Sequence, residues 1–203
     1  MNILSSRNFY IADTHFDHNN IIKFDNRPFF NQEDMNSTLI KNWNKVVHKN
    51  DNVFVLGDFC WSKEERWIEL LSELKGVKYL VKGNHDLKQM STKLKNFWAD
   101  IKDYKEITDK NRKVILCHYP ILCYKNSYKK DTYMLFGHVH NQTQESLFIK
   151  KCISELKQNN LRSDYPACNK GNLFNVGCMM SYMNYTPRTL DELIQVSKEQ
   201  EDE

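Results

Sequence analysis

The sequence has little of what marks membrane or secreted proteins. No apolar stretch approaches the roughly 20 residues that a membrane-spanning helix requires. The N-terminal residues 1–7 lack the apolar core of a signal peptide. Six cysteines are present, but none forms a Cys-x-x-Cys pair, so we expect reduced thiols rather than disulfides or a cysteine zinc site. We therefore expect a cytoplasmic protein that has no membrane partner.

The sequence also lacks a strong charge of either sign. Twenty-nine Lys and Arg residues face 26 Asp and Glu residues, which gives a formal net charge of +3. A nucleic-acid-binding domain usually carries a larger and clustered basic excess, so there is no strong nucleic-acid signal. A chain of 203 residues can bury a sizeable core, and it shows no repeat and no linker. We expect one domain over residues 1–203 and leave the oligomeric state open.

Glycine is scarce, with six residues, and four of the six lie at the ends of apolar runs. Six short apolar runs end in a metal-ligating residue type or in a glycine turn. These runs are 9–15, 53–58, 79–86, 114–118, 134–140 and 173–177. Five of the seven histidines fall within them. Asp and Asn favour turns, so one or two such blocks could be ordinary turns. Five blocks in order favour a metal site along one edge of a sheet.

The residue types at these strand ends define the chemistry of that site. Asp13 and His15 are two residues apart, so in an extended segment both side chains can reach one ion. The carboxylate of Asp58 has two oxygens that can bridge two cations. The candidate ligands mix oxygen and nitrogen donors without a thiolate, which favours Mn²⁺, Fe or Zn²⁺ over Ca²⁺. They are Asp13, His15, Asp58, Asn84, His118, His138 and His140.

Seven ligands exceed what one tetrahedral ion can use, and they suit two ions that share Asp58. Two ions roughly 3.5–4 Å apart can clamp a phosphate and activate a water molecule. We therefore expect two divalent metal ions as cofactors, with Mn²⁺ favoured and Fe or Zn²⁺ as alternatives. The expected partner is a phosphate-ester substrate, with a nucleotide as one option.

Strands and helices are expected to alternate, which predicts an α/β fold. A polar segment covers 16–31, and an irregular loop covers 159–171. Asn31 and the sequences Ser62–Glu65 and Thr189–Glu192 are expected to cap helices. The predicted strands are 9–12, 53–56, 79–81, 104–107, 113–117, 132–136 and 173–176. The predicted helices are 33–48, 87–97 and 145–158, with two more that begin at the two capping boxes.

The ordered blocks Asp-x-His, Gly-Asp, Gly-Asn-His-Asp, His and Gly-His-x-His resemble the calcineurin-like metallophosphoesterases. The flanking Thr-His-Phe-Asp-His and Arg-Pro-Phe segments are similar to small bacterial and phage members. The resemblance extends from Asp13 to about Leu193. It implies a four-layer α/β/β/α sandwich of two mixed sheets flanked by helices. It also implies hydrolysis of phosphate esters by in-line attack of a hydroxide that bridges two metals.

The resemblance also implies a role for each candidate residue. His85 is expected to protonate the leaving-group oxygen. Asp86 is predicted to orient His85 solely because it is adjacent in the sequence. The first ion would be held by Asp13, His15 and His140; the second by Asn84, His118 and His138; and Asp58 would bridge them. His18 and Arg27 are predicted substrate contacts, although a surface or capping contact is an equal alternative for both.

Three functions fit these residues. A phosphodiesterase is slightly favoured, because a diester needs the leaving-group activation that His85 offers. A small-molecule phosphomonoesterase and, less favoured, a non-catalytic scaffold on the same fold are the alternatives. Relatives often carry an acidic residue soon after the Asn-Val-Gly turn, whereas this chain has Cys178-Met-Met-Ser-Tyr182. A stretch at 145–172 is also added, and its role stays open.

Overall fold

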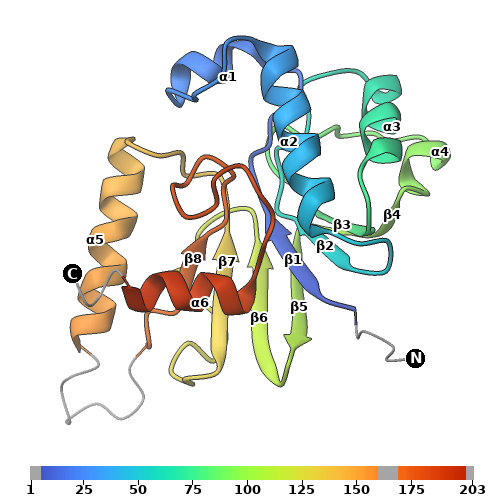
Figure 1. Ribbon diagram of the computed structural model, residues 1–203. Coiled ribbons are helices and arrows are strands. Elements are labelled where there is room, and N and C mark those ends of the chain that lie inside the picture. Colours follow the sequence, from blue (N-terminus) through green and yellow to red (C-terminus); the bar gives the residue numbers. More distant parts are fainter. Residues whose placement is uncertain (1–5, 160–168, 200–203) are drawn as a thin grey trace.

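The computed structural model describes residues 6–159 and 169–199, which form two mixed sheets flanked by helices (Figure 1). The first sheet has the order β4-β3-β2-β1-β9. Its strands are β1 (Asn8–Ile11), β2 (Asn52–Val55), β3 (Val77–Val81), β4 (Trp98–Lys102) and β9 (Arg188–Thr189). The strands from β1 to β4 pair in parallel, and β9 is antiparallel to β1.

The second sheet has the order β5-β6-β7-β8. Its strands are β5 (Tyr104–Asp109), β6 (Arg112–Cys117), β7 (Thr132–Phe136) and β8 (Leu173–Asn175). Strands β6, β7 and β8 are parallel, whereas β5 and β6 form an antiparallel hairpin. The predicted turn at 109–111 is confirmed. Lys110 and Asn111 both have positive φ, at 47° and 67°, as two-residue hairpin turns require.

Helices cover the outer face of each sheet, which gives the predicted four-layer sandwich. Helices α2, α3 and α4 lie beside the first sheet, and α5 and α6 lie beside the second (Figure 1). The helices are α1 (Asn19–Phe24), α2 (Gln32–Val46), α3 (Glu64–Glu73), α4 (Thr92–Lys95), α5 (Gln144–Asn159) and α6 (Leu190–Glu199). None of the helices in the described ranges is long and apolar enough to cross a membrane.

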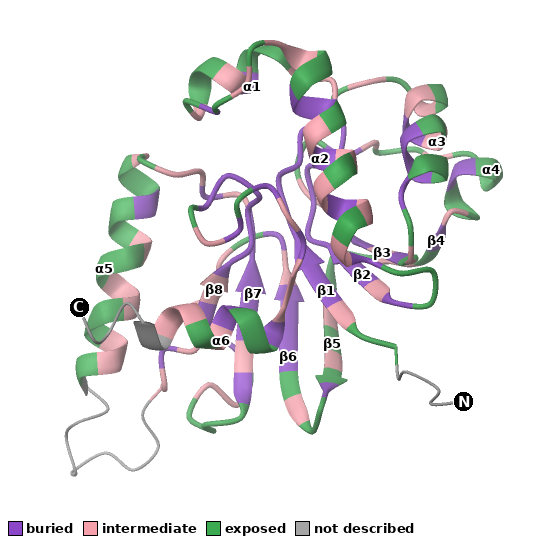
Figure 2. Ribbon diagram, viewed as in Figure 1, coloured by how far each residue is buried: buried purple, intermediate pink, exposed green. Residues whose placement is uncertain are grey.

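Alternation along the strands of the second sheet divides the core in two. Val114, Leu116 and Leu135 face the main core, whereas Ile115 and Phe136 belong to a smaller cluster that packs against α5. Figure 2 shows β1 and β7 as largely buried, whereas β5 at the edge of the second sheet carries exposed residues. A central strand that is buried on both faces needs apolar residues at every position, which is why β1 and β7 appear as nearly continuous apolar runs.

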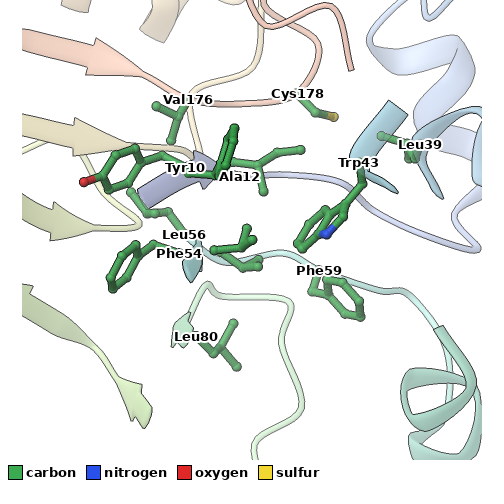
Figure 3. Packing of buried hydrophobic residues seen from close by; sticks show 14 of the residues in the cluster. Tyr10, Ala12, Leu39, Trp43, Phe54, Leu56, Phe59, Leu80, Val176 and Cys178 are labelled. Carbon is green, nitrogen blue, oxygen red and sulfur yellow. The ribbon is translucent and has the colours of Figure 1, made fainter. Parts of the chain in front are cut away.

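The two sheets are joined where β1 and β8 end. The backbone N–H of Ala12 donates to the carbonyl of Val176, and the carbonyl of Ala12 accepts the N–H of Cys178. Val176 in turn donates to Phe136 at the end of β7. In Figure 3, Tyr10 and Ala12 of the first sheet lie against Val176 within the shared core. This junction places the carboxyl ends of both sets of parallel strands at one edge of the sandwich.

Local capping agrees with the sequence in two of three places. Asn31 accepts the N–H of Asp34 at 2.9 Å, as predicted. Thr189 and Glu192 form the predicted box, in which the Thr189 N–H reaches the Glu192 carboxylate at 2.7 Å. The predicted box at Ser62 is wrong, because α3 begins after Lys63, whose side chain makes no capping bond. Trp61, the residue before Ser62, donates its backbone N–H to the carbonyl of Phe16. This bond still ties the chain to the loop at Phe16, so the helix starts later than predicted.

The segment after β3 differs most from the prediction. The predicted helix at 87–97 is reduced to the four residues of α4, and the unpredicted strand β4 follows directly. Strand β4 pairs in parallel with β3 at the edge of the first sheet, so tertiary pairing overrides the local helical pattern. The polar segment 16–31 contains the unpredicted helix α1, and β9 is a further unpredicted strand. Most of the loop expected at 159–171 lies outside the described residues.

Candidate metal centre

The loops that follow β1, β2, β3, β6 and β7 meet at the shared edge, where open α/β sheets place their ligand sites. Four of the predicted ligands on these loops have left-handed backbones. They are Asp13, His15, Asp58 and His138, with φ of 54°, 46°, 53° and 66°. Such conformations are uncommon outside glycine and concentrate at functional sites. The backbone is thus shaped to turn these side chains inward.

One group of donors consists of Asp13, His15 and His140, whose ligand atoms lie within 4.8 Å of one another. The Nε2 atom of His140 is 4.0 Å from Asp13 Oδ1. The Nε2 atom of His15 is buried and has no hydrogen-bond partner. A buried imidazole nitrogen without a partner is costly, and it is the kind of group that a cation satisfies.

A second group lies on the other side of Asp58. Asp58 Oδ2 is 3.7 Å from His15 Nε2 and 3.6 Å from His118 Nε2, so this oxygen lies between the two imidazoles. The amide oxygen of Asn84 is 3.0 Å from both His118 Nε2 and His138 Nδ1. The seven residues predicted as ligands from the sequence are therefore all brought together in one cluster.

Hydrogen bonds behind the ligands set the direction of two imidazoles. His140 Nδ1 lies 2.7 Å from a carboxylate oxygen of Asp25, and His118 Nδ1 lies 2.8 Å from the carbonyl of Leu56. These contacts favour a proton on Nδ1 and leave Nε2 of each ring free to accept a cation. Such partners are the usual support of metal-binding histidines. Asp25 was not predicted from the sequence.

Arg27 occupies a different place from the predicted phosphate contact. Its side chain is fully buried and forms an ion pair with Asp25 at 2.8 Å. The guanidinium also donates to the carbonyls of Asp13 and Thr14, at 2.9 and 3.1 Å. This position argues against direct contact with substrate. Arg27 instead holds the Asp13 loop and, through Asp25, the ring of His140.

Asp86 also differs from its predicted role as a partner of His85. Its carboxylate accepts three backbone N–H groups, from Asp58 at 3.1 Å, Phe59 at 2.9 Å and Gly83 at 2.7 Å. Adjacent residues in a tight turn point in different directions, and so Asp86 faces the backbone while His85 faces solvent. The carboxylate ties the Asp58 loop to the Asn84 loop and so sets the distance between their side chains.

His85 and His18 line an open cleft of about 720 Å³ in front of the donor cluster. The His85 side chain is exposed, and its backbone N–H donates to Asp58 Oδ1 at 2.9 Å. His18 is half-buried and stacks on Trp61, with ring centroids 4.2 Å apart and planes 8° apart. His15, His138 and His140 line the same cleft. Both predicted substrate-side histidines thus face the space that a ligand would enter.

Burial governs the protonation of the cluster. It lowers the pKa of His15, His118 and His138, which keeps these rings neutral with a free lone pair. Burial raises the pKa of Asp13 to about 7. For His140, burial lowers the pKa, but the hydrogen bond with Asp25 and the charge of Asp13 outweigh it and raise the pKa overall. A divalent cation bound among these groups would favour neutral imidazoles and the charged form of the carboxylate.

The donor set fits two divalent cations. Asp58 lies between two imidazoles, His15 Nε2 is unpartnered, and three of the rings are neutral. Carboxylate, amide and imidazole donors without thiolate suit Mn²⁺, Fe or Zn²⁺.

Residues 7–185 match the calcineurin-like phosphoesterase superfamily domain. The chain belongs to this superfamily. A relative is found in Methanocaldococcus jannaschii, an uncharacterised protein that is 41% identical over 150 residues, or 72% of this chain and 77% of the relative. The gene 66 protein of Mycobacterium phage L5 is 33% identical over 84 residues, or 40% of each chain.

A solved structure supports the fold of the superfamily for this chain. It is a protein of unknown function from Aquifex aeolicus, with 25% sequence identity and a TM-score of 0.67. The match covers 95% of this chain and all of the other. The fold shared with this protein therefore extends over nearly the whole chain.

The segment 178–182, which follows the Asn-Val-Gly turn, contains no acidic residue. Its first residue, Cys178, is buried, and its Sγ lies 3.1 Å from the Asp13 carbonyl. Asn175 accepts the Gly177 N–H at 2.8 Å and donates to the Val139 carbonyl at 2.6 Å, so it links this turn to the His138 loop. The departure thus lies behind the donor cluster and leaves its ligand side unchanged.

Proposed function

We propose that the protein is a dinuclear metal-dependent phosphoesterase that hydrolyses phosphodiesters, with Mn²⁺ as the favoured metal. One observation carries this proposal. Asp58 presents one carboxylate oxygen between His15 and His118, while its other oxygen accepts the N–H of His85. Asp58, which would contact both ions, is therefore hydrogen-bonded to His85, which would protonate the leaving group.

Each side chain of the cluster has a role in this proposal. Asp58 would contact both ions. The hydrogen bond from the Asp58 backbone N–H to the Asp86 carboxylate would keep Asp58 between them. The ions, when bound, would polarise the phosphate and lower the pKa of a coordinated water. The first ion would take Asp13, His15 and His140, and the second Asn84, His118 and His138.

His85 would act as the general acid. The attacking water would first give up one proton to solvent. As its oxygen forms a bond to phosphorus, the bond from phosphorus to the leaving-group oxygen breaks. The protonated imidazole of His85 gives its proton to that oxygen, which leaves as an alcohol, and the product is a phosphate monoester. The exposed ring at the cleft suits this role, because it can reach an ester held against the donor cluster.

The proposal is tested by turnover of two diesters with Mn²⁺, bis(4-nitrophenyl) phosphate and diphenyl phosphate. The phenol of the second is a poorer leaving group and needs a proton more. We expect His85→Ala to lower kcat by about 10²–10⁴-fold on diphenyl phosphate and by less on the nitrophenyl ester. His48→Ala is the matched control, because that side chain is exposed and follows the end of α2.

Each alternative function has its own outcome. An equal loss on both diesters would contradict proton donation by His85. Faster turnover of 4-nitrophenyl phosphate than of either diester would favour the phosphomonoesterase. No metal-stimulated turnover of any of the three esters would refute the hydrolase and favour a scaffold.

A further inference from the structure

Two half-exposed aromatic side chains flank the candidate metal centre. Trp61 follows β2 and Tyr119 follows β6, and they are 45% and 46% exposed. Trp61 lies 6.2 Å from the ring of His15, on one side of Asp58. Tyr119 lies 5.1 Å from the ring of His118, on the other side. Large aromatic side chains usually bury most of their surface, so an exposed pair at one site suggests a ligand.

Both rings are held in place by the donor loops. The backbone N–H of Trp61 donates to Phe16 at 2.8 Å, and the indole stacks on His18. Tyr119 meets His118 and His138 edge to face, with interplanar angles of 76° and 64°. A fixed ring loses little conformational entropy when a flat group stacks on it.

The two rings differ in what they adjoin. The centroid of Trp61 is 4.6 Å from that of His85, the proposed general acid, so this side would receive the leaving group. The centroid of Tyr119 is 4.7 Å from that of His138, and His138 lines a second cavity of about 400 Å³. That cavity is mainly apolar, with Pro120 and Phe148 in its lining. This side would receive the ester group that stays on phosphorus.

The charge of the surroundings limits the substrate further. Among the described residues that line the two cavities there is no Lys or Arg; of the acidic ones, Asp25 pairs with Arg27 and Asp17 with Arg66, and Glu145 is also present. A long nucleic acid would bring additional phosphates to a lining that offers them no Lys or Arg. The site therefore suits a ligand whose negative charge is confined to the phosphate at the centre.

We propose that Trp61 and Tyr119 are two stacking surfaces that bind the two ester groups of a small phosphodiester. The substrate class is a diester with a flat, uncharged ring on each side of a single phosphate, such as a dinucleoside phosphate. This inference rests on the proposed function, and it adds the substrate class and two specificity-determining residues. A monoester, which has one organic group, would use only one of the two surfaces.

The test compares bis(4-nitrophenyl) phosphate with methyl 4-nitrophenyl phosphate, which share a leaving group and differ in the group that stays. We expect Tyr119→Leu to raise KM and lower kcat/KM for the bis ester by about 5- to 100-fold, with less than about twofold change for the methyl ester. Trp61→Leu should lower kcat/KM for both esters. Tyr119→Phe and Trp61→Phe, which keep a ring, should retain most activity.

Tyr128→Leu is the matched control, because Tyr128 is similarly exposed, at 44%, whereas Tyr119 lies against His138, which lines both cavities. The Phe variants and melting temperatures separate a loss of stacking from a loss of fold. Equal effects of Tyr119→Leu on both esters, or no effect on either, would overturn the inference while the proposed function stands. If the parent protein turns over neither ester, the proposed function fails and the inference fails with it.

Discussion

Replacing Asp86 with Asn tests whether this carboxylate holds the site together. Asp86 Oδ2 accepts the N–H groups of Asp58 and Gly83, and Oδ1 accepts that of Phe59. The Asn side chain has one oxygen and one NH₂ group, so at least one buried N–H loses its acceptor and faces another donor. The hydrogen bonds that remain are made to a neutral amide oxygen instead of a charged carboxylate oxygen, so each is weaker.

The size of the effect follows from these bonds. A hydrogen bond to a charged group contributes about 1.5–3 kcal/mol, and an unsatisfied buried donor costs about 1–3 kcal/mol. Burial makes the loss smaller. It raises the pKa of Asp86, so the charged carboxylate is costly to keep in the folded protein, and the neutral Asn removes that cost. The net expected loss in the free energy of unfolding is about 2–3 kcal/mol.

Urea unfolding of the metal-free protein measures this loss directly. The control is Asp103→Asn, whose carboxylate is 83% exposed and pairs with Lys82 at 3.2 Å; we expect a change within about 0.5 kcal/mol. If Asp86→Asn unfolds like the parent, the three backbone bonds do not stabilise the site as described. If it retains stability but loses turnover, Asp86 acts on His85 after all.

Two further predictions concern the donor cluster. A Cβ at Gly83 would lie 2.3 Å from Asp58 Oδ1 and 2.7 Å from Asp58 N, so Gly83→Ala must displace Asp58. We therefore expect the variant to bind Mn²⁺ more weakly when affinity is measured by isothermal titration calorimetry. An unchanged affinity would contradict this prediction. Burial raises the pKa of Asp13 to about 7, above its value in the unfolded chain, so the folded protein binds this proton more tightly. In the metal-free protein the contribution of Asp13 to stability should therefore be lost as the pH rises from about 4 to about 7, by at most about 4 kcal/mol. The lowered pKa values of His15, His118 and His138 act in the opposite direction, so thermal unfolding in a chelator compares the parent with Asp13→Asn across this range. The stability of the parent relative to Asp13→Asn should fall as the pH rises, and a constant or rising difference would contradict the sign.

The ligand positions were predictable because parallel strands bring their carboxyl ends to one edge. Asp13, Asp58 and His118 lie within three residues of such an end, so their residue types and strand assignments were enough to predict that they would meet. The ordered pattern also predicted the two sheets. Secondary structure at a sheet edge was less predictable, as β4 shows, because its pairing with β3 is non-local.

The residues behind the ligands were harder to predict, because their roles depend on direction rather than on position. Arg27 has a charge suited to phosphate, yet its segment folds beneath Asp13 and buries the guanidinium. Asp86 is adjacent to His85 in the sequence but points to backbone amides. Asp25 and Trp61 carry no motif, and only the fold brings them to the site. Sequence patterns identify ligands, whereas supporting contacts require coordinates.

In the proposed function both ions share the carboxylate of Asp58, and metal stoichiometry tests this sharing most directly. Equilibrium dialysis against Mn²⁺, followed by elemental analysis, should find two ions per chain in the parent protein. Asp58→Asn should keep its fold by circular dichroism and retain fewer than two, because the neutral amide lacks the negative charge that offsets two cations held close together. Two ions retained at parental affinity in Asp58→Asn, or a single ion in the parent protein, would contradict a shared Asp58.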